Sequence, residues 1–136
     1  MAKSSTGAVR ASGLALTLQC ATALIELMVV AIAAAGFDEV ADASPLGRQG
    51  TIVAAVALCV VTLIGAGAAW RGVSGALRTT VAILVFVGVG IIALMAFFFL
   101  IAGGVPIVFA VLLTHAALSV ALIGRTVLGA PSGVKG

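Results

Sequence analysis

Four long runs of apolar residues dominate the chain, and short polar segments separate them. The runs cover approximately residues 13–36, 51–70, 79–101 and 105–124. Each is close to the roughly 20 residues that a helix needs to cross the core of a bilayer. The runs are continuous rather than alternating, and four segments are too few to close a β-barrel. The pattern predicts an all-α membrane protein, a single integral membrane domain over 1–136 with four antiparallel transmembrane helices in an up-down bundle.

The overall composition also favours lipid as the solvent. The chain of 136 residues is 63% hydrophobic and 8% charged, whereas soluble domains have about 45–50% apolar and about 25% charged residues. A soluble fold of this length cannot bury so much apolar surface, because small folded chains keep roughly a third of their surface exposed. The lipid bilayer is therefore the first predicted partner.

The connection between the first two runs, residues 36–50, is the longest. It carries three carboxylates, from Asp38, Glu39 and Asp42, without the alternating ligand positions of a calcium loop. We expect a solvated loop and no metal site. Ser44 followed by Pro45 is typical of a helix start, with serine as the N-cap and proline in the first turn.

The glycine pair before the fourth run predicts a tight turn. Gly103 and Gly104 end the third helix, and Pro106 suits the first turn of the fourth. Three consecutive phenylalanines, at 97–99, precede this turn and predict a lipid-facing or interfacial aromatic cluster.

The basic residues predict the orientation. Six of the seven lie at the chain ends or between the second and third runs, namely Lys3, Arg10, Arg71, Arg78, Arg125 and Lys135. By the positive-inside rule these segments are cytoplasmic. We expect a multi-pass protein of the plasma membrane with both termini in the cytoplasm. The first run also resembles a signal peptide, but it is longer than the usual apolar region and contains Gln19 and Glu26, which favours a retained helix.

Glu26, near the middle of the first run, is the most informative residue. A carboxylate at the centre of a spanning helix costs about 2.5–3.5 kcal/mol on insertion scales, so such residues face the protein interior and usually have a partner. Gln19 and Thr22 share its helical face. The single histidine, His115, lies near the middle of the fourth run, at a depth that matches Glu26 within about one helical turn of roughly 5 Å.

Other polar residues of the apolar runs could lie beside Glu26 and His115, and together they predict a polar cluster in the middle of the membrane, which we call the polar seam. Ser119 shares the face of His115, and Thr62 lies among small residues of the second run. The candidate seam consists of Glu26, His115, Gln19, Thr22, Thr62 and Ser119.

Two classes of function fit this seam. A non-enzymatic structural or accessory subunit would use it, with Glu26 protonated, to hold the helices together, in a homo-oligomer or a larger membrane complex. Alternatively, a small transporter or proton- or ion-conducting protein would use Glu26 and His115 directly, as a relay or to bind a cationic substrate.

Other classes find no support in the chain. No nucleotide-binding, hydrolase or metalloprotease motif occurs, so we expect neither an enzyme nor a cofactor. A catalytic set of Ser119, His115 and Glu26 is conceivable without any motif around it. Cys20 and Cys59 lack zinc-site spacing and read as packing residues. The basic residues have no interleaved aromatic residues, which argues against nucleic acid.

Four short helices with one glutamate in the first resemble the layout of the small multidrug-resistance exporters. In that family the carboxylate lies among aromatic residues that hold cationic drugs, whereas this chain has no tyrosine and a single tryptophan, Trp70, at a predicted interface. The resemblance implies a layout, and no site residue is transferred from it.

Overall fold

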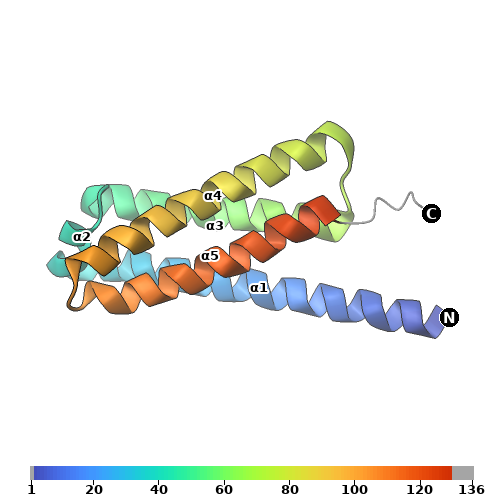
Figure 1. Cartoon of the computed structure of the whole chain (residues 1–136), viewed down its shortest axis with the longest axis horizontal. Coiled ribbons are helices and arrows are strands. Elements are labelled where there is room, and N and C mark those ends of the chain that lie inside the picture. Colours follow the sequence, from blue (N-terminus) through green and yellow to red (C-terminus); the bar gives the residue numbers. More distant parts are fainter. Residues whose placement is uncertain (1, 130–136) are drawn as a thin grey trace.

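The computed structural model describes the backbone of residues 2–129 and the side chains of residues 13–129. It contains five helices within this range: α1 (Ala2–Gly36), α2 (Asp38–Ala43), α3 (Gly47–Arg71), α4 (Gly75–Ala102) and α5 (Pro106–Gly129) (Figure 1). The Gly13–Gly36 part of α1 and the whole of α3, α4 and α5 are long and apolar enough to cross a membrane. The prediction of an all-helical chain with four such segments is confirmed, and it indicates a multi-pass membrane protein.

The helices are longer than the apolar runs. α3 begins at Gly47 rather than near residue 51, α4 begins at Gly75 rather than near 79, and α5 continues to Gly129 rather than ending near 124. The backbone of the N-terminal arm is helical from Ala2. Hydropathy marks the part of a helix that suits lipid, whereas backbone hydrogen bonds continue into polar sequence beyond it.

The polar connection after α1 contains a short helix that the apolar pattern does not reveal. α2 starts with Asp38 and Glu39, which suit the positive end of a helix dipole. The position of Ser44 before proline suggested that it caps the next helix. In the structure Ser44 follows α2 and does not cap α3. Its Oγ instead accepts hydrogen bonds from the Leu46 backbone N–H at 3.2 Å and from the Thr51 hydroxyl. Ser44 therefore stabilises the turn between the two helices.

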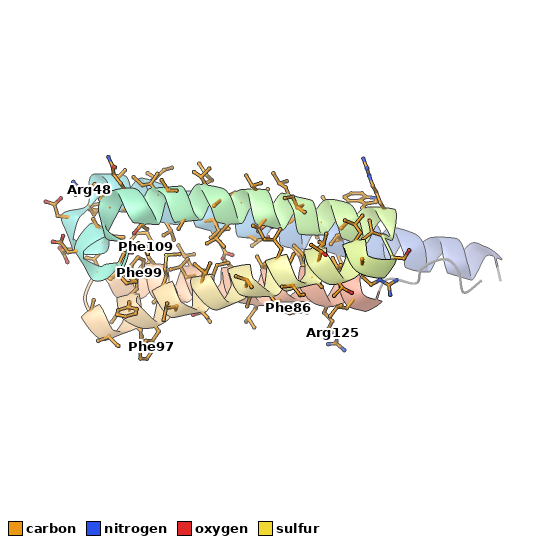
Figure 2. All side chains as sticks on the ribbon, turned by 90° about the horizontal axis from the view of Figure 1, so that it is seen from above. Arg48, Phe86, Phe97, Phe99, Phe109 and Arg125 are labelled. Atoms are coloured by element: carbon orange, nitrogen blue, oxygen red, sulfur yellow. The ribbon has the colours of Figure 1, made fainter. Side chains whose placement is uncertain are left out.

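Arg48 joins three helices at this end of the bundle (Figure 2). Its Nε donates to the carbonyl oxygen of Ala34 at 3.0 Å, and its guanidinium pairs with the Asp38 carboxylate. The side chain thus satisfies a carbonyl in the last turn of α1 that has no partner within that helix. The single basic residue of the acidic connection has a structural role here.

The long helices form a four-helix bundle. α1 packs on α3 and α5, α4 packs on the same two helices, and α3 and α5 also pack on each other; α1 and α4 have no close backbone approach within residues 2–129. The α1–α3 and α4–α5 connections lie at one end of the molecule and the α3–α4 connection at the other (Figure 1). Gly103 and Gly104, with φ of 71° and 67°, form the predicted turn before Pro106.

The inner faces of the helices supply an apolar core. Leu27, Ile92, Leu113 and Phe99 are fully buried. Phe99 lies between the helices, whereas Phe97 points outward (Figure 2). The phenylalanine triplet therefore does not form one lipid-facing cluster, because successive residues of a helix point about 100° apart.

Gly65 of α3 lies close to α4 and α5. A Cβ atom at this position would lie 2.7 Å from Cγ2 of Val85 and 3.3 Å from Cγ2 of Ile123. We expect Gly65→Ala to destabilise the bundle by about 1–3 kcal/mol, the usual cost of overpacking. Thermal unfolding in detergent micelles measures this difference.

Gly67, two residues further along the same helix, is the matched control. A Cβ atom there would have no atom within 4 Å, so Gly67→Ala should be neutral or stabilising by up to about 1 kcal/mol through helix propensity. Equal effects of the two substitutions would contradict the packing described here.

Candidate functional site

Glu26 and His115 form a direct polar contact between the first and last long helices. Nδ1 of His115 lies 3.0 Å from Oε1 and 2.9 Å from Oε2 of Glu26. The two residues are near the middle of the apolar part of α1 and of α5, so the contact lies far from the helix ends. We call this pair the Glu26–His115 clasp. The structure thus brings together the two residues that the matching depths suggested.

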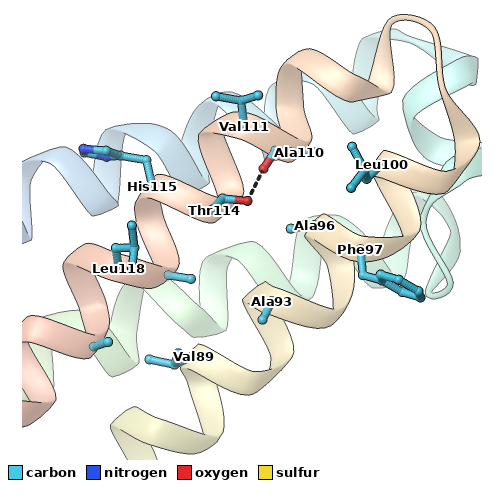
Figure 3. A pocket seen from close by; sticks show the side chains of 12 residues that line it. Val89, Ala93, Ala96, Phe97, Leu100, Ala110, Val111, Thr114, His115 and Leu118 are labelled. Carbon is cyan, nitrogen blue, oxygen red and sulfur yellow. Dashed lines mark hydrogen bonds between the residues drawn. The ribbon is translucent and has the colours of Figure 1, made fainter.

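The clasp has a buried half and an exposed half. The Glu26 side chain is 11% exposed, whereas the His115 side chain is 59% exposed on the outside of the bundle. Ala23 and Val30, which share the helical face of Glu26, are fully buried. The imidazole points from α5 toward α1 (Figure 3). The pair is consequently reached from the outer edge of the α1–α5 contact.

Chemically, the clasp can share one proton between the carboxyl group and Nδ1. The neutral pair has two forms: a protonated Glu26 that donates to Nδ1, or a carboxylate that accepts from a protonated imidazole. A net charge in hydrocarbon is expensive, so a neutral pair is the form that suits a membrane interior.

The other four members of the predicted seam do not join the clasp. The Thr62 hydroxyl is buried and donates to the carbonyl of Leu58 in its own helix at 2.8 Å. Ser119 is buried, and Gln19 and Thr22 are half-buried. No side-chain hydrogen bond of these three residues occurs within the described part of the chain. A hydroxyl can bond to its own helix, so small polar residues need not meet across helices.

Thr114, next to His115, is a further polar residue on the exposed side of α5. Its hydroxyl donates to the carbonyl of Ala110 at 2.8 Å (Figure 3). Together with His115 it lines a groove of about 610 Å³ between α4 and α5, which is otherwise apolar. Its position beside the only histidine is visible in the sequence, but its exposure requires the fold.

The described residues do not form a metal site or a disulfide bond. No group of three or more His, Cys, Asp or Glu side chains among them is placed to hold a metal ion. Cys20 and Cys59 are free and half-buried. The three acidic residues near α2 are exposed, and Asp38 is paired with Arg48.

The site geometry is the basis for any functional conclusion. Comparisons with models of known families, with curated proteins and with solved structures find no match to this chain.

Proposed function

We propose that the four long helices cross the plasma membrane in alternating directions, with both termini in the cytoplasm. The lengths and apolarity of the helices support this, as does the distribution of basic residues. The α1–α3 and α4–α5 connections lie at the same end, and Arg48, in the first turn of α3, is the single basic residue of residues 36–50 and 102–106. The acidic end would then face outward.

Within this membrane domain, we propose a non-enzymatic structural or accessory role, in a homo-oligomer or a larger membrane complex. The observation that carries it is the Glu26–His115 clasp, which joins the first and last helices. The Glu26 side chain is only 11% exposed. A polar contact packed in this way fixes which helices touch, much as single buried polar residues fix register in coiled coils.

A small transporter or a proton- or ion-conducting protein is the second candidate. A titratable carboxyl group in contact with an imidazole is favourable for proton transfer, and such residues within a membrane often mark ion pathways. The two functions differ in what they require of Glu26. Transport needs its titration, whereas the clasp needs only its hydrogen bond.

A flux assay on the purified protein in liposomes separates these functions. We expect no pH-gradient-driven or ion flux above that of empty liposomes, because the Glu26 side chain is largely buried. We also expect the chain to co-purify with a larger assembly in mild detergent. The same assay is run on two variants: Glu26→Gln, and Glu39→Gln as a control that lies outside the membrane-spanning helices.

The opposite result is equally specific. A flux that Glu26→Gln abolishes and Glu39→Gln leaves intact would assign transport to the clasp and contradict the structural role.

A further inference from the structure

The outward-facing nitrogen of His115 lacks a partner within the described chain. Nδ1 contacts Glu26, and Nε2 has no hydrogen bond with residues 13–129. In both neutral forms of the clasp, the shared proton lies between Nδ1 and the carboxyl group, so Nε2 carries a hydrogen. An N–H group without an acceptor is costly in hydrocarbon, because lipid tails offer no hydrogen bonds. Lipid alone therefore does not satisfy this face of α5.

The same face carries an acceptor close to this donor. The Thr114 hydroxyl uses its hydrogen on the Ala110 carbonyl, which leaves the lone pairs of its oxygen free. Val111 and Leu118 form an exposed ridge along α5. Thr114 and His115 follow Val111 by three and four residues, so they flank this ridge on opposite sides. Thr114 lies on the flank toward α4, and His115 on the flank toward α1.

Thr114 and His115 both line a groove between α4 and α5. The groove between α4 and α5 has alanines along it, including Ala93, Ala96 and Ala121, and lies beside the ridge (Figure 3). Small residues of this kind allow a neighbouring helix to approach closely. The groove thus has an acceptor, Thr114, on one side of the ridge and a donor, His115, on the other.

We propose that this face of α5 binds a second copy of the chain about a two-fold axis along the Val111–Leu118 ridge. The axis places the His115 flank of each copy against the Thr114 flank of the other, so that Nε2–H of His115 donates to Oγ of Thr114 of the second copy. Two equivalent hydrogen bonds form, as an isologous interface requires. The inference rests on the proposed membrane insertion, which makes the free N–H costly.

The distribution of charge selects this kind of axis. Basic residues concentrated on one side orient all copies alike, so a two-fold axis runs parallel to the membrane normal and each residue near it meets its own equivalent. His115 and Thr114 are adjacent in the sequence and therefore lie at the same depth across the interface. An acyl chain fits the groove by shape but provides no acceptor for Nε2.

Disulfide cross-linking in membranes tests the interface. The background is Cys20→Ala and Cys59→Ala, and single cysteines replace Leu118 on the ridge or Val60, an exposed residue near the middle of α3. We expect oxidation to cross-link Leu118→Cys into dimers at least about tenfold more than Val60→Cys. Ala93→Phe, a change at an exposed position, fills the groove and should remove the cross-link.

Thr114→Val tests the hydrogen bonds separately. Symmetry removes two of them at once, so dimerisation should weaken about tenfold, if each bond contributes roughly the average of intramembrane hydrogen bonds. A monomer at every protein-to-lipid ratio, equal cross-linking at Val60→Cys, or a dimer unaffected by Ala93→Phe would overturn the proposal. The flux assay is independent of these outcomes, because dimers can form whether or not Glu26 supports transport.

Discussion

Replacing His115 with leucine is expected to destabilise the bundle in a bilayer by about 1–3 kcal/mol, the cost of leaving a buried polar group without its partner. The Glu26 carboxyl group would remain largely buried. Glu26→Leu should also destabilise the bundle, because it leaves the His115 imidazole without its partner. The double substitution should recover part of the loss, since neither polar group remains. Reversible unfolding in mixed micelles measures all four proteins.

The coupling free energy between the two positions is the decisive quantity. Intramembrane hydrogen bonds average about 0.6 kcal/mol and reach about 1.7 kcal/mol in such cycles. The same cycle with Glu39→Leu and His115→Leu is the control and should be additive. A coupling free energy within about 0.3–0.5 kcal/mol of zero, the error of additivity, would contradict a contact between Glu26 and His115.

Phe99→Ala is expected to destabilise the bundle by about 3 kcal/mol, at the lower end of the range for buried phenylalanines. The Phe99 ring is fully buried and is the largest such side chain of the core. In lipid the loss comes from packing contacts and a cavity, because transfer to hydrocarbon gains little. Unfolding in the same mixed micelles gives the free energy.

Phe97 and Phe98 provide the matched controls for this change. Both side chains are exposed and contact each other edge to face, with ring centroids 6.1 Å apart. Their replacement by alanine removes lipid-facing rings and should cost below about 1 kcal/mol, because no cavity forms in the core. Equal losses for all three phenylalanines would contradict the orientation of α4.

The four apolar helices were predictable, because their length and composition reflect a simple solvent requirement. The exact ends of the helices were less predictable. Gly47 and Gly75 begin helices in polar sequence. α2 lies entirely within a polar segment for which hydropathy predicts no helix. The acidic start of α2 is a signal that the sequence contains. Ser44 shows the ambiguity of such signals, since serine before proline suits a turn as well as a helix start.

The candidate site shows a similar division. Matching depths suggested that Glu26 and His115 meet, because straight helices of fixed rise place residues at calculable heights. Depth says nothing about rotation, however. Whether the imidazole faces the core or the outside depends on which helices are neighbours, and the sequence does not define the order of the helices around the bundle. The exposure of His115 and the separation of Thr62 from the clasp follow from that order.

The most direct test of the Glu26–His115 clasp is solid-state NMR of the full chain in lipid bilayers. His115 is the only histidine in the sequence, so a ring ¹⁵N label reports on one residue. Glu39→Gln leaves Glu26 as the only glutamate carboxyl group. Dipolar recoupling should then detect Nδ1 of His115 within about 4 Å of the Glu26 carboxyl carbon, as a hydrogen bond requires. No coupling between these two nuclei in a folded, membrane-inserted protein would contradict the clasp and the structural role built on it.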